Sequence, residues 1–219
     1  MPVPECAQLE ELREYIGDCH RCPLGDSRIT LVFGVGDSRA RVMLVGEAPG
    51  RTEDVTGLPF VGAAGTFLDE LLAQARLSRD EVYVTNVVKC RPPGNRNPAP
   101  LEVRTCSPFL REQIRLIDPS VIVTLGNFAT RAVLETDRSI TALRGAVRTL
   151  GSRRVLPVFH PAAAIYDRSK RDVLLGDFSL LRELLDESDE APESESSRGP
   201  EGRVGGGHQE SIFPAEDIR

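Results

Sequence analysis

Val42-Met-Leu-Val-Gly-Glu-Ala-Pro-Gly50 is the stretch that decides the fold, because an apolar run ends there in a glycine-rich turn. A short apolar run bounded by turn residues is typical of a strand buried on both faces. Similar runs are found at Val82 to Val84, Val121 to Leu125 and Val155 to Phe159. We predict that these runs are the strands of one sheet.

Segments with helical periodicity lie between these strands, at Thr66 to Ala75, Leu101 to Ile117 and Asn127 to Leu134. Alternating strands and helices predict a parallel sheet covered on both faces. Further helices, expected at Leu9 to Ile16 and Phe178 to Leu185, would close the domain. The sequence therefore predicts an α/β fold with a central four-stranded parallel sheet flanked by helices.

The charge distribution separates one domain from a tail. The chain has 219 residues and a formal net charge of -6, yet residues 186–219 alone hold ten acids and three bases. The overall acidity therefore does not exclude a DNA partner. The tail is rich in Ser, Gly and Pro and poor in large apolar residues, so it cannot offset the entropy of ordering. We predict a domain over residues 1–185 and a disordered acidic tail over 186–219.

The cellular location is also suggested by the sequence. No stretch approaches the roughly 18 consecutive apolar residues of a membrane span. The N-terminus is charged within its first few positions, unlike a secretory signal. We expect a cytoplasmic monomer that does not associate with membranes.

The cysteines are spaced as metal ligands often are. Cys19 and Cys22 form a C-x2-C pair, Cys90 follows the second predicted strand, and Cys106 lies on the next predicted helix. Disulfides are uncommon in the cytosol, so this set suggests a metal site, and four thiolates suit zinc or an iron-sulfur cluster equally well. A redox pair at Cys19 and Cys22, or simply buried thiols, are the alternatives. Cys6 is expected to be free.

Polar and aromatic residues gather where the predicted strands end. The Gly46 to Gly50 loop, Asn86 and His160 follow three strands, and the carboxyl ends of parallel strands meet at one edge of the sheet. An Asn amide can pair with a pyrimidine edge, a ring such as that of Phe60 can stack on a base, and a His can bond a carbonyl. Taken individually, Asn86 could be a turn residue, Phe60 a core residue and His160 a helix cap. Their convergence favours a site for a base.

Four motifs occur in order along the chain: GEAPGRTED at 46–54, GLPFVGAAG at 57–65, TNVVKCRPP at 85–93 and FHPAA at 159–163. Together with the four cysteines, they resemble the family-4 uracil-DNA glycosylases, the iron-sulfur branch of that superfamily. The match runs from about Cys19 to Tyr166. The resemblance implies that deoxyuridine is flipped out of DNA and that its N-glycosidic bond is hydrolysed. It also implies a structural 4Fe-4S cluster on Cys19, Cys22, Cys90 and Cys106, with zinc as the alternative metal.

The same resemblance assigns roles in uracil binding. Phe60 would stack on the flipped uracil, Asn86 would read its Watson-Crick edge and reject cytosine, and His160 would stabilise the charge that develops on O2. The backbone of three consecutive residues would line the pocket: Glu47, Ala48 and Pro49.

The catalytic carboxylate is not settled by the resemblance. In family-1 enzymes the corresponding loop reads GQDPYH, so Ala48 falls where their water-activating Asp sits and Gly50 where their thymine-excluding Tyr sits. A transition state with oxocarbenium character is stabilised by a carboxylate near the sugar. Glu47 and Glu53 are the candidates, and Asn95 is a weaker third.

The segment after His160 is expected to contact DNA. Family members often carry Leu in a loop that enters the minor groove, whereas this chain has Ile165 and Tyr166, of which either is expected to substitute. Three nearby basic residues are the expected phosphate contacts: Arg168, Lys170 and Arg171.

Other functions are compatible with parts of this pattern. A non-catalytic protein that binds uracil or damaged DNA through the same fold is the main alternative, and an unrelated hydrolase or redox protein using Cys19 and Cys22 is another. The segment Gln209-Glu-Ser-Ile-Phe213 resembles short peptides that dock on bacterial sliding clamps, although Glu210 and Ile212 replace the usual leucines. Clamp docking is therefore a hypothesis, with an inert tail as the alternative.

Overall fold

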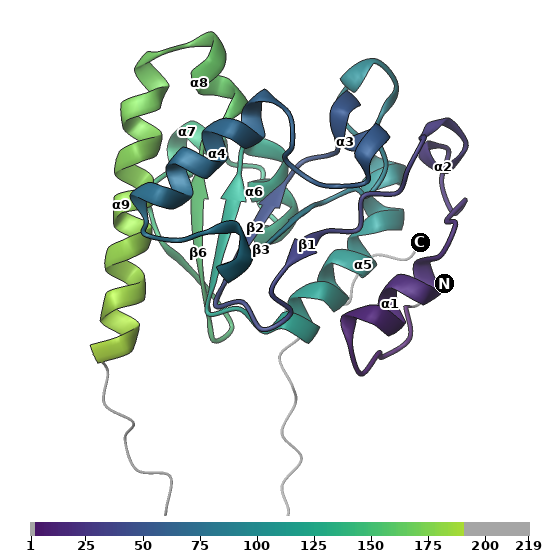
Figure 1. Cartoon of the computed structure of the whole chain (residues 1–219), viewed down its shortest axis with the longest axis horizontal. Helices are drawn as coiled ribbons and strands as arrows, with labels where there is room; N and C mark the ends of the chain where they lie inside the picture. Colours follow the sequence, from purple (N-terminus) through teal and green to yellow (C-terminus); the bar gives the residue numbers. More distant parts are fainter. Residues whose placement is uncertain (1–2, 191–219) are drawn as a thin grey trace, which may run out of the picture.

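A mixed six-stranded sheet forms the centre of the computed structural model, which describes residues 3–190 (Figure 1). The strand order is β1-β3-β2-β4-β6-β5. The strands are β1 (Val35–Gly36), β2 (Val42–Gly46), β3 (Val82–Asn86), β4 (Val121–Leu125), β5 (Arg148–Leu150) and β6 (Arg153–Val158).

The four central strands are parallel, as the sequence predicts. The prediction of a four-stranded sheet is nevertheless wrong, because β1 pairs antiparallel with β3 and β5 pairs antiparallel with β6. These edge strands have two and three residues and are largely exposed. Neither contains a buried apolar run, so only hydrogen bonding to a neighbouring strand defines them.

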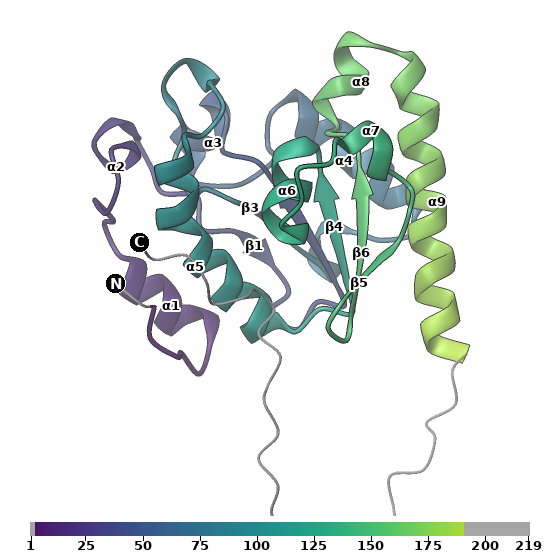
Figure 2. The same cartoon turned by 180° about the vertical axis from the view of Figure 1, so that it is seen from behind.

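Helices cover both faces of the sheet (Figures 1 and 2). One face packs against α1 (Leu9–Ile16), α5 (Pro100–Ile117) and α6 (Asn127–Leu134), and the other against α4 (Ala63–Gln74) and α9 (Ser169–Glu190). The short helices are α2 (Leu24–Ser27), α3 (Arg51–Thr56), α7 (Ile140–Leu143) and α8 (Ala162–Tyr166), and 3-10 turns span Arg79–Glu81 and Pro93–Asn95.

Residues along β2 alternate between the two hydrophobic cores. Met43 and Val45 pack on the α1, α5 and α6 side, whereas Val42 and Leu44 pack on the α4 and α9 side. Because both faces are covered, a continuous apolar run is required instead of an alternating one. This is the physical reason why the run at 42–45 decides the fold.

The last helix is longer than predicted. α9 continues to Glu190, beyond the predicted domain boundary at Leu185. Arg182 Nε donates to Asp186 Oδ2 at 2.9 Å one turn later, a spacing that supports a helix across the boundary. The rest of the predicted tail, including Gln209 to Phe213, lies outside the described residues. Among residues 3–190, no helix has the length and apolar character needed to cross a membrane.

Candidate active site

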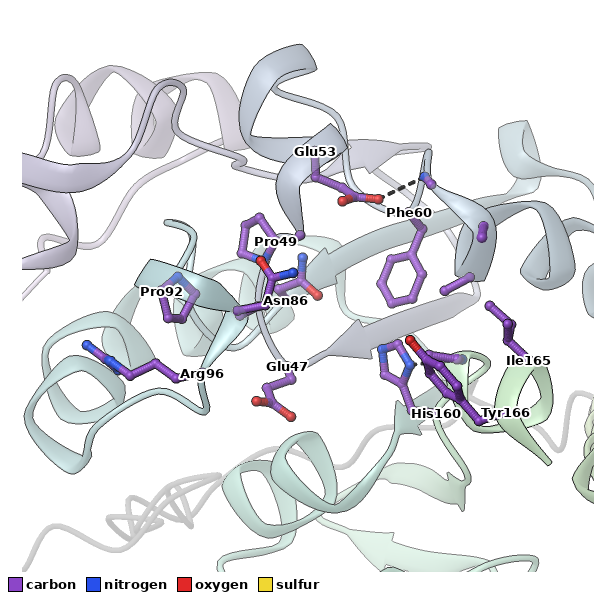
Figure 3. Close-up of a pocket in the computed structure, with 17 residues that line it drawn as sticks. Glu47, Pro49, Glu53, Phe60, Asn86, Pro92, Arg96, His160, Ile165 and Tyr166 are labelled. Carbon is purple, nitrogen blue, oxygen red and sulfur yellow. Dashed lines mark hydrogen bonds between the residues drawn. The ribbon is translucent and has the colours of Figure 1, made fainter.

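A cavity of about 410 Å³ opens at the carboxyl edge of the parallel strands (Figure 3). The loop after β2, the segment between α3 and α4, the end of β3, the 93–95 turn and α8 all contribute to its walls. Ten predicted site residues line it: Glu47, Ala48, Pro49, Glu53, Phe60, Asn86, Asn95, His160, Ile165 and Tyr166. The predicted phosphate contacts Arg168, Lys170 and Arg171 are not among the lining residues.

Asn86 is buried with an unpaired polar atom. It is the last residue of β3 and is 2% exposed, and its Oδ1 has no hydrogen-bond partner among the described residues. A buried polar atom without a partner costs about 1–3 kcal/mol. Such an atom in a cavity wall is suited to bind a ligand that brings a donor.

Gly46 allows Asn86 and Phe60 to approach the end of β2. A Cβ at position 46 would lie 2.3 Å from Asn86 Oδ1 and 2.6 Å from Phe60 Cζ. Both distances are far below van der Waals contact, so a larger residue would displace both side chains. The glycine is therefore required by the arrangement of the pocket.

Phe60 is held in an unusual backbone conformation. Its φ is 53°, in the left-handed region that bulky residues rarely adopt. Arg79 Nη2 donates to the Phe60 carbonyl at 2.8 Å, and a Cβ on Gly65 would lie only 1.7 Å from that oxygen. The Phe60 ring stacks with that of His160 at a centroid distance of 5.6 Å and an interplanar angle of 25°. These contacts fix an aromatic wall on one side of the cavity (Figure 3).

His160 is a neutral hydrogen-bond donor. The Ala162 N–H donates to His160 Nδ1 at 3.1 Å, so the neutral ring carries its proton on Nε2. Burial lowers the pKa of His160 from 6.5 to about 4, although the charge of Glu53 acts in the opposite direction. The ring can therefore donate a hydrogen bond at neutral pH without carrying a charge.

The two candidate carboxylates differ in their contacts. Glu53 Oε1 accepts hydrogen bonds from the N–H groups of Val61 and Gly62, at 3.0 and 2.9 Å, and so holds the chain that follows Phe60 (Figure 3). Glu47 is partly buried, and burial raises the pKa of its carboxyl group. Within residues 3–190 no group hydrogen-bonds to the Glu47 carboxylate. The carboxylate of Glu47 is thus free to bind a ligand, whereas that of Glu53 holds the backbone after Phe60 in place.

The proline-rich loop supplies the opposite wall. Asn95 Oδ1 accepts a hydrogen bond from Arg91 Nε at 2.7 Å. Arg96, which sequence reasoning missed, also lines the cavity and pairs with buried Glu102 through two hydrogen bonds of 2.6 and 2.9 Å. No spacing in the sequence distinguishes Arg96 from other surface arginines.

The segment around α8 lies at the mouth of the cavity. The side chains of Ile165 and Tyr166 are 48% and 90% exposed. Arg168 is exposed, and no partner for its guanidinium group is found in the described part of the chain. Lys170 instead pairs with Asp167 at 3.3 Å, and Arg171 pairs with Glu70.

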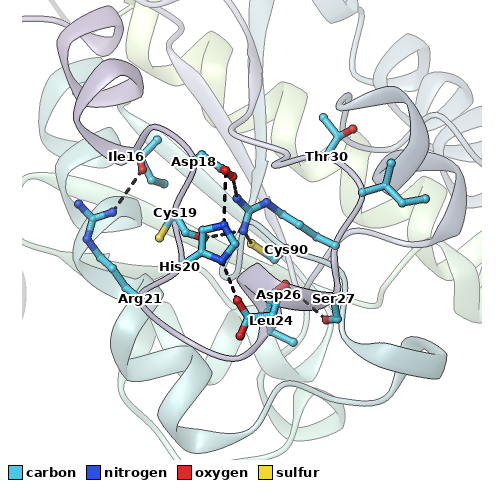
Figure 4. Close-up of polar contacts among 12 residues, drawn as sticks. Ile16, Asp18, Cys19, His20, Arg21, Leu24, Asp26, Ser27, Thr30 and Cys90 are labelled. Atoms are coloured by element: carbon cyan, nitrogen blue, oxygen red, sulfur yellow. Dashed lines mark hydrogen bonds and ion pairs between the residues drawn. The ribbon is translucent and has the colours of Figure 1, made fainter.

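The four predicted ligand cysteines lie in one hydrophobic cluster, and none is in a disulfide. Cys19 and Cys22 precede α2, Cys90 follows β3, and Cys106 lies on α5. Figure 4 shows Cys19 and Cys90 in this region. Across residues 3–190, no three His, Cys, Asp or Glu side chains are spaced to hold a single metal ion.

Hydrogen-bond donors point at two of the sulfurs. Arg28 Nη1 donates to Cys90 Sγ at 3.6 Å, and the Lys89 N–H donates to Cys106 Sγ at 3.3 Å. Burial raises the pKa of Cys90 to about 12 and that of Cys106 to about 11. Metal binding favours thiolates, and N–H donors to sulfur are the outer-shell contacts that stabilise them. The residues therefore fit a thiolate-bound metal group.

Comparison with known proteins identifies the class. The profile of the uracil DNA glycosylase superfamily matches residues 33–183, and the chain belongs to this superfamily. Sequence similarity to type-4 uracil-DNA glycosylases narrows the assignment within the superfamily. That of Sulfurisphaera tokodaii is 44% identical, covering 80% of this chain and 84% of the relative. Those of Archaeoglobus fulgidus and Thermotoga maritima are 41% and 42% identical. These matches cover 80% of this chain, and 92% and 96% of the respective relatives. The chain belongs to the type-4 uracil-DNA glycosylases.

Proposed function

We propose that this protein excises uracil from DNA by hydrolysing the N-glycosidic bond of deoxyuridine, which leaves an abasic site. The observation that carries the proposal is the cavity in which unpaired Asn86 Oδ1, Phe60 and neutral His160 lie together. The test is uracil release from single- and double-stranded oligonucleotides. Binding of uracil-containing DNA without release would indicate the non-catalytic alternative.

Uracil recognition follows from the chemistry of Asn86 and Phe60. Uracil presents an N3–H donor next to the O4 acceptor, and an Asn amide offers an acceptor and a donor in matching positions. Cytosine presents the reverse pattern, so the same amide orientation is mismatched. Phe60 stacks on the base, and the glycosylase reads the flipped nucleotide inside the cavity.

Bond cleavage uses His160 and a carboxylate. As the C1′–N1 bond breaks, its electron pair moves into the uracil ring, and the Nε2–H of His160 donates to the O2 that becomes negative. The sugar acquires positive character, which the carboxylate of Glu47 stabilises while it orients the attacking water. We assign this role to Glu47 before Glu53, whose Oε1 already binds two backbone amides. Asn95 is the third candidate.

DNA binding extends from the cavity mouth. Ile165 or Tyr166 fills the space that the flipped nucleotide leaves. Arg168 contacts a phosphate directly, whereas Lys170 and Arg171 exchange their carboxylate partners for phosphates on binding.

For the four cysteines we propose a 4Fe-4S cluster, with Cys19, Cys22, Cys90 and Cys106 as ligands. When bound, the cluster crosslinks the N-terminal loop, the segment after β3 and α5. The clustered thiols and the N–H donors to sulfur support a thiolate-bound metal group, and the resemblance to the iron-sulfur branch of the superfamily favours the cluster over zinc. Iron and sulfide analysis of protein prepared without oxygen distinguishes the two metals.

Replacing Gly46 by Ala is expected to lower kcat/KM for uracil release by at least about tenfold, or about 1.4 kcal/mol. The added Cβ would collide with Asn86 Oδ1 and Phe60 Cζ. Uracil release and thermal unfolding are measured together. The control is Gly176→Ala in α9, where a Cβ meets nothing within 4 Å. Equal activity of the Gly46→Ala and Gly176→Ala proteins would contradict the proposed packing.

The ring of His160 is expected to stay neutral down to about pH 5. Its folded pKa of about 4 lies below the unfolded value of 6.5, so its contribution to stability is complete above pH 6.5 and is lost as the pH falls towards 4. The chain has only three histidines, and nitrogen NMR of the imidazoles resolves them. His20 should titrate above 6.5, because hydrogen bonds to Asp26 and Asp18 raise its pKa. A His160 ring that titrates near 6.5 would refute the neutral-donor assignment.

For the tail we propose docking of Gln209 to Phe213 on a bacterial sliding clamp. A tethered segment with one apolar anchor raises the local concentration of the enzyme at the replication fork. A peptide covering residues 208–219 is expected to bind the host's clamp at least about tenfold more tightly than its Phe213→Ala variant, because deleting a buried Phe side chain removes more than about 1.4 kcal/mol. Equal, weak binding of the two peptides would indicate an inert tail.

A further inference from the structure

Lys89 is a buried lysine that the proposed mechanism does not use. It is 1% exposed, and its Nζ donates to Thr85 Oγ1 at 2.6 Å, to the Asn86 carbonyl at 2.7 Å and to Gln113 Oε1 at 2.6 Å. An ammonium group has three donors, so each one has an acceptor. One of the acceptors is the backbone of the residue assigned to read uracil.

The backbone of Lys89 faces the cysteines. Its N–H donates to Cys106 Sγ at 3.3 Å, and the next residue is Cys90. Cys106 and Gln113 both lie on α5, two turns apart. Lys89 therefore binds α5 at two points, through its backbone and its side chain, while it holds the Asn86 carbonyl.

The position of Asn86 depends on the hydrogen bond from Lys89 to its carbonyl, because no hydrogen bond within the described residues holds its side chain. Its Oδ1 has no hydrogen-bond partner among the described residues, so packing and the backbone position set the direction of the amide. Gly46 and Phe60 supply the packing. The hydrogen bond from Lys89 fixes the carbonyl at the end of β3.

We propose that Lys89 is a positioning residue for uracil recognition, which ties the Asn86 backbone to α5 and the four-cysteine site. The inference rests on the proposed function, because it assumes that Asn86 reads the base. It gives the cysteine site a role in the geometry of the pocket in addition to holding the chain together.

The test is Lys89→Met, which keeps the length of the side chain but removes its charge and donors. We expect the variant to fold and to bind iron and sulfide, while its Kd for free uracil, measured by calorimetry or inhibition, rises about tenfold or more. The control is Leu71→Ala on α4, a buried residue in the other core. It should lower Tm but leave the uracil Kd unchanged.

A Lys89→Met protein with the wild-type uracil Kd, at a temperature where both are folded, would overturn the inference. If Lys89→Met does not fold, the Thr85→Val variant tests the inference instead. Valine keeps the shape of threonine and removes one acceptor of the ammonium group. A Kd about threefold weaker is then expected, and an unchanged Kd overturns the inference. Failure of the wild type to release uracil would instead reject the proposed function.

Discussion

Asn86→Asp should lose uracil excision, with kcat/KM reduced by at least about 100-fold. A carboxylate has no donor for O4 and repels that oxygen, and loss of a good polar contact alone costs about 1–3 kcal/mol. The new charge would also be buried, since Asn86 is 2% exposed. Uracil release under single-turnover conditions measures the loss.

The matched control for this variant is Asn127→Asp. Asn127 begins α6, outside the lining of the cavity, and its Oδ1 accepts from the Ile140 N–H at 3.0 Å. An aspartate keeps that acceptor, so activity should stay at the wild-type level. Unchanged uracil kinetics in Asn86→Asp would remove Asn86 from base recognition.

Cys90→Ser should lose the brown colour of an iron-sulfur protein and lower Tm by more than about 10 °C. Structural metal sites contribute on the order of 10 kcal/mol to folding, and about 1 kcal/mol shifts Tm by a few degrees in a domain of this size. As a proposed ligand of the cluster, Cys90 would join the sheet to the N-terminal loop and α5, and serine would break this link. Absorbance, iron content and thermal unfolding measure it.

Cys6→Ser is the control for the metal prediction. Cys6 is also buried, and its Sγ donates to the Pro4 carbonyl at 3.6 Å, apart from the four proposed ligands. Colour and iron content should stay at the wild-type level. A colourless wild type that contains stoichiometric zinc, prepared without oxygen, would refute the iron-sulfur assignment.

The central fold could be predicted from the sequence because its signals are local. The run at 42–45 encodes a strand buried on both faces, and α1 and α6 begin and end where their periodicity predicts. The edge strands could not be predicted in this way. Two or three exposed residues carry no pattern, and pairing with β3 or β6 alone makes them strands.

The sequence by itself determined which residues meet at the site. Parallel strands bring their carboxyl ends together, so Gly46, Asn86 and His160 converge once the strands are assigned. Their family motifs are also stretches of continuous sequence. The sequence therefore predicts which side chains line the cavity at this edge of the sheet.

Only the tertiary structure decided what each group in the site can do. The Ala162 N–H fixes the tautomer of His160, two backbone amides bind Glu53 and leave Glu47 as the available carboxylate, and Lys89 links Asn86 to α5. These contacts depend on burial and on distances of about 3 Å between groups that only folding brings together. Residue type and spacing do not encode such distances, because one side chain can donate, accept or remain unpaired according to its neighbours.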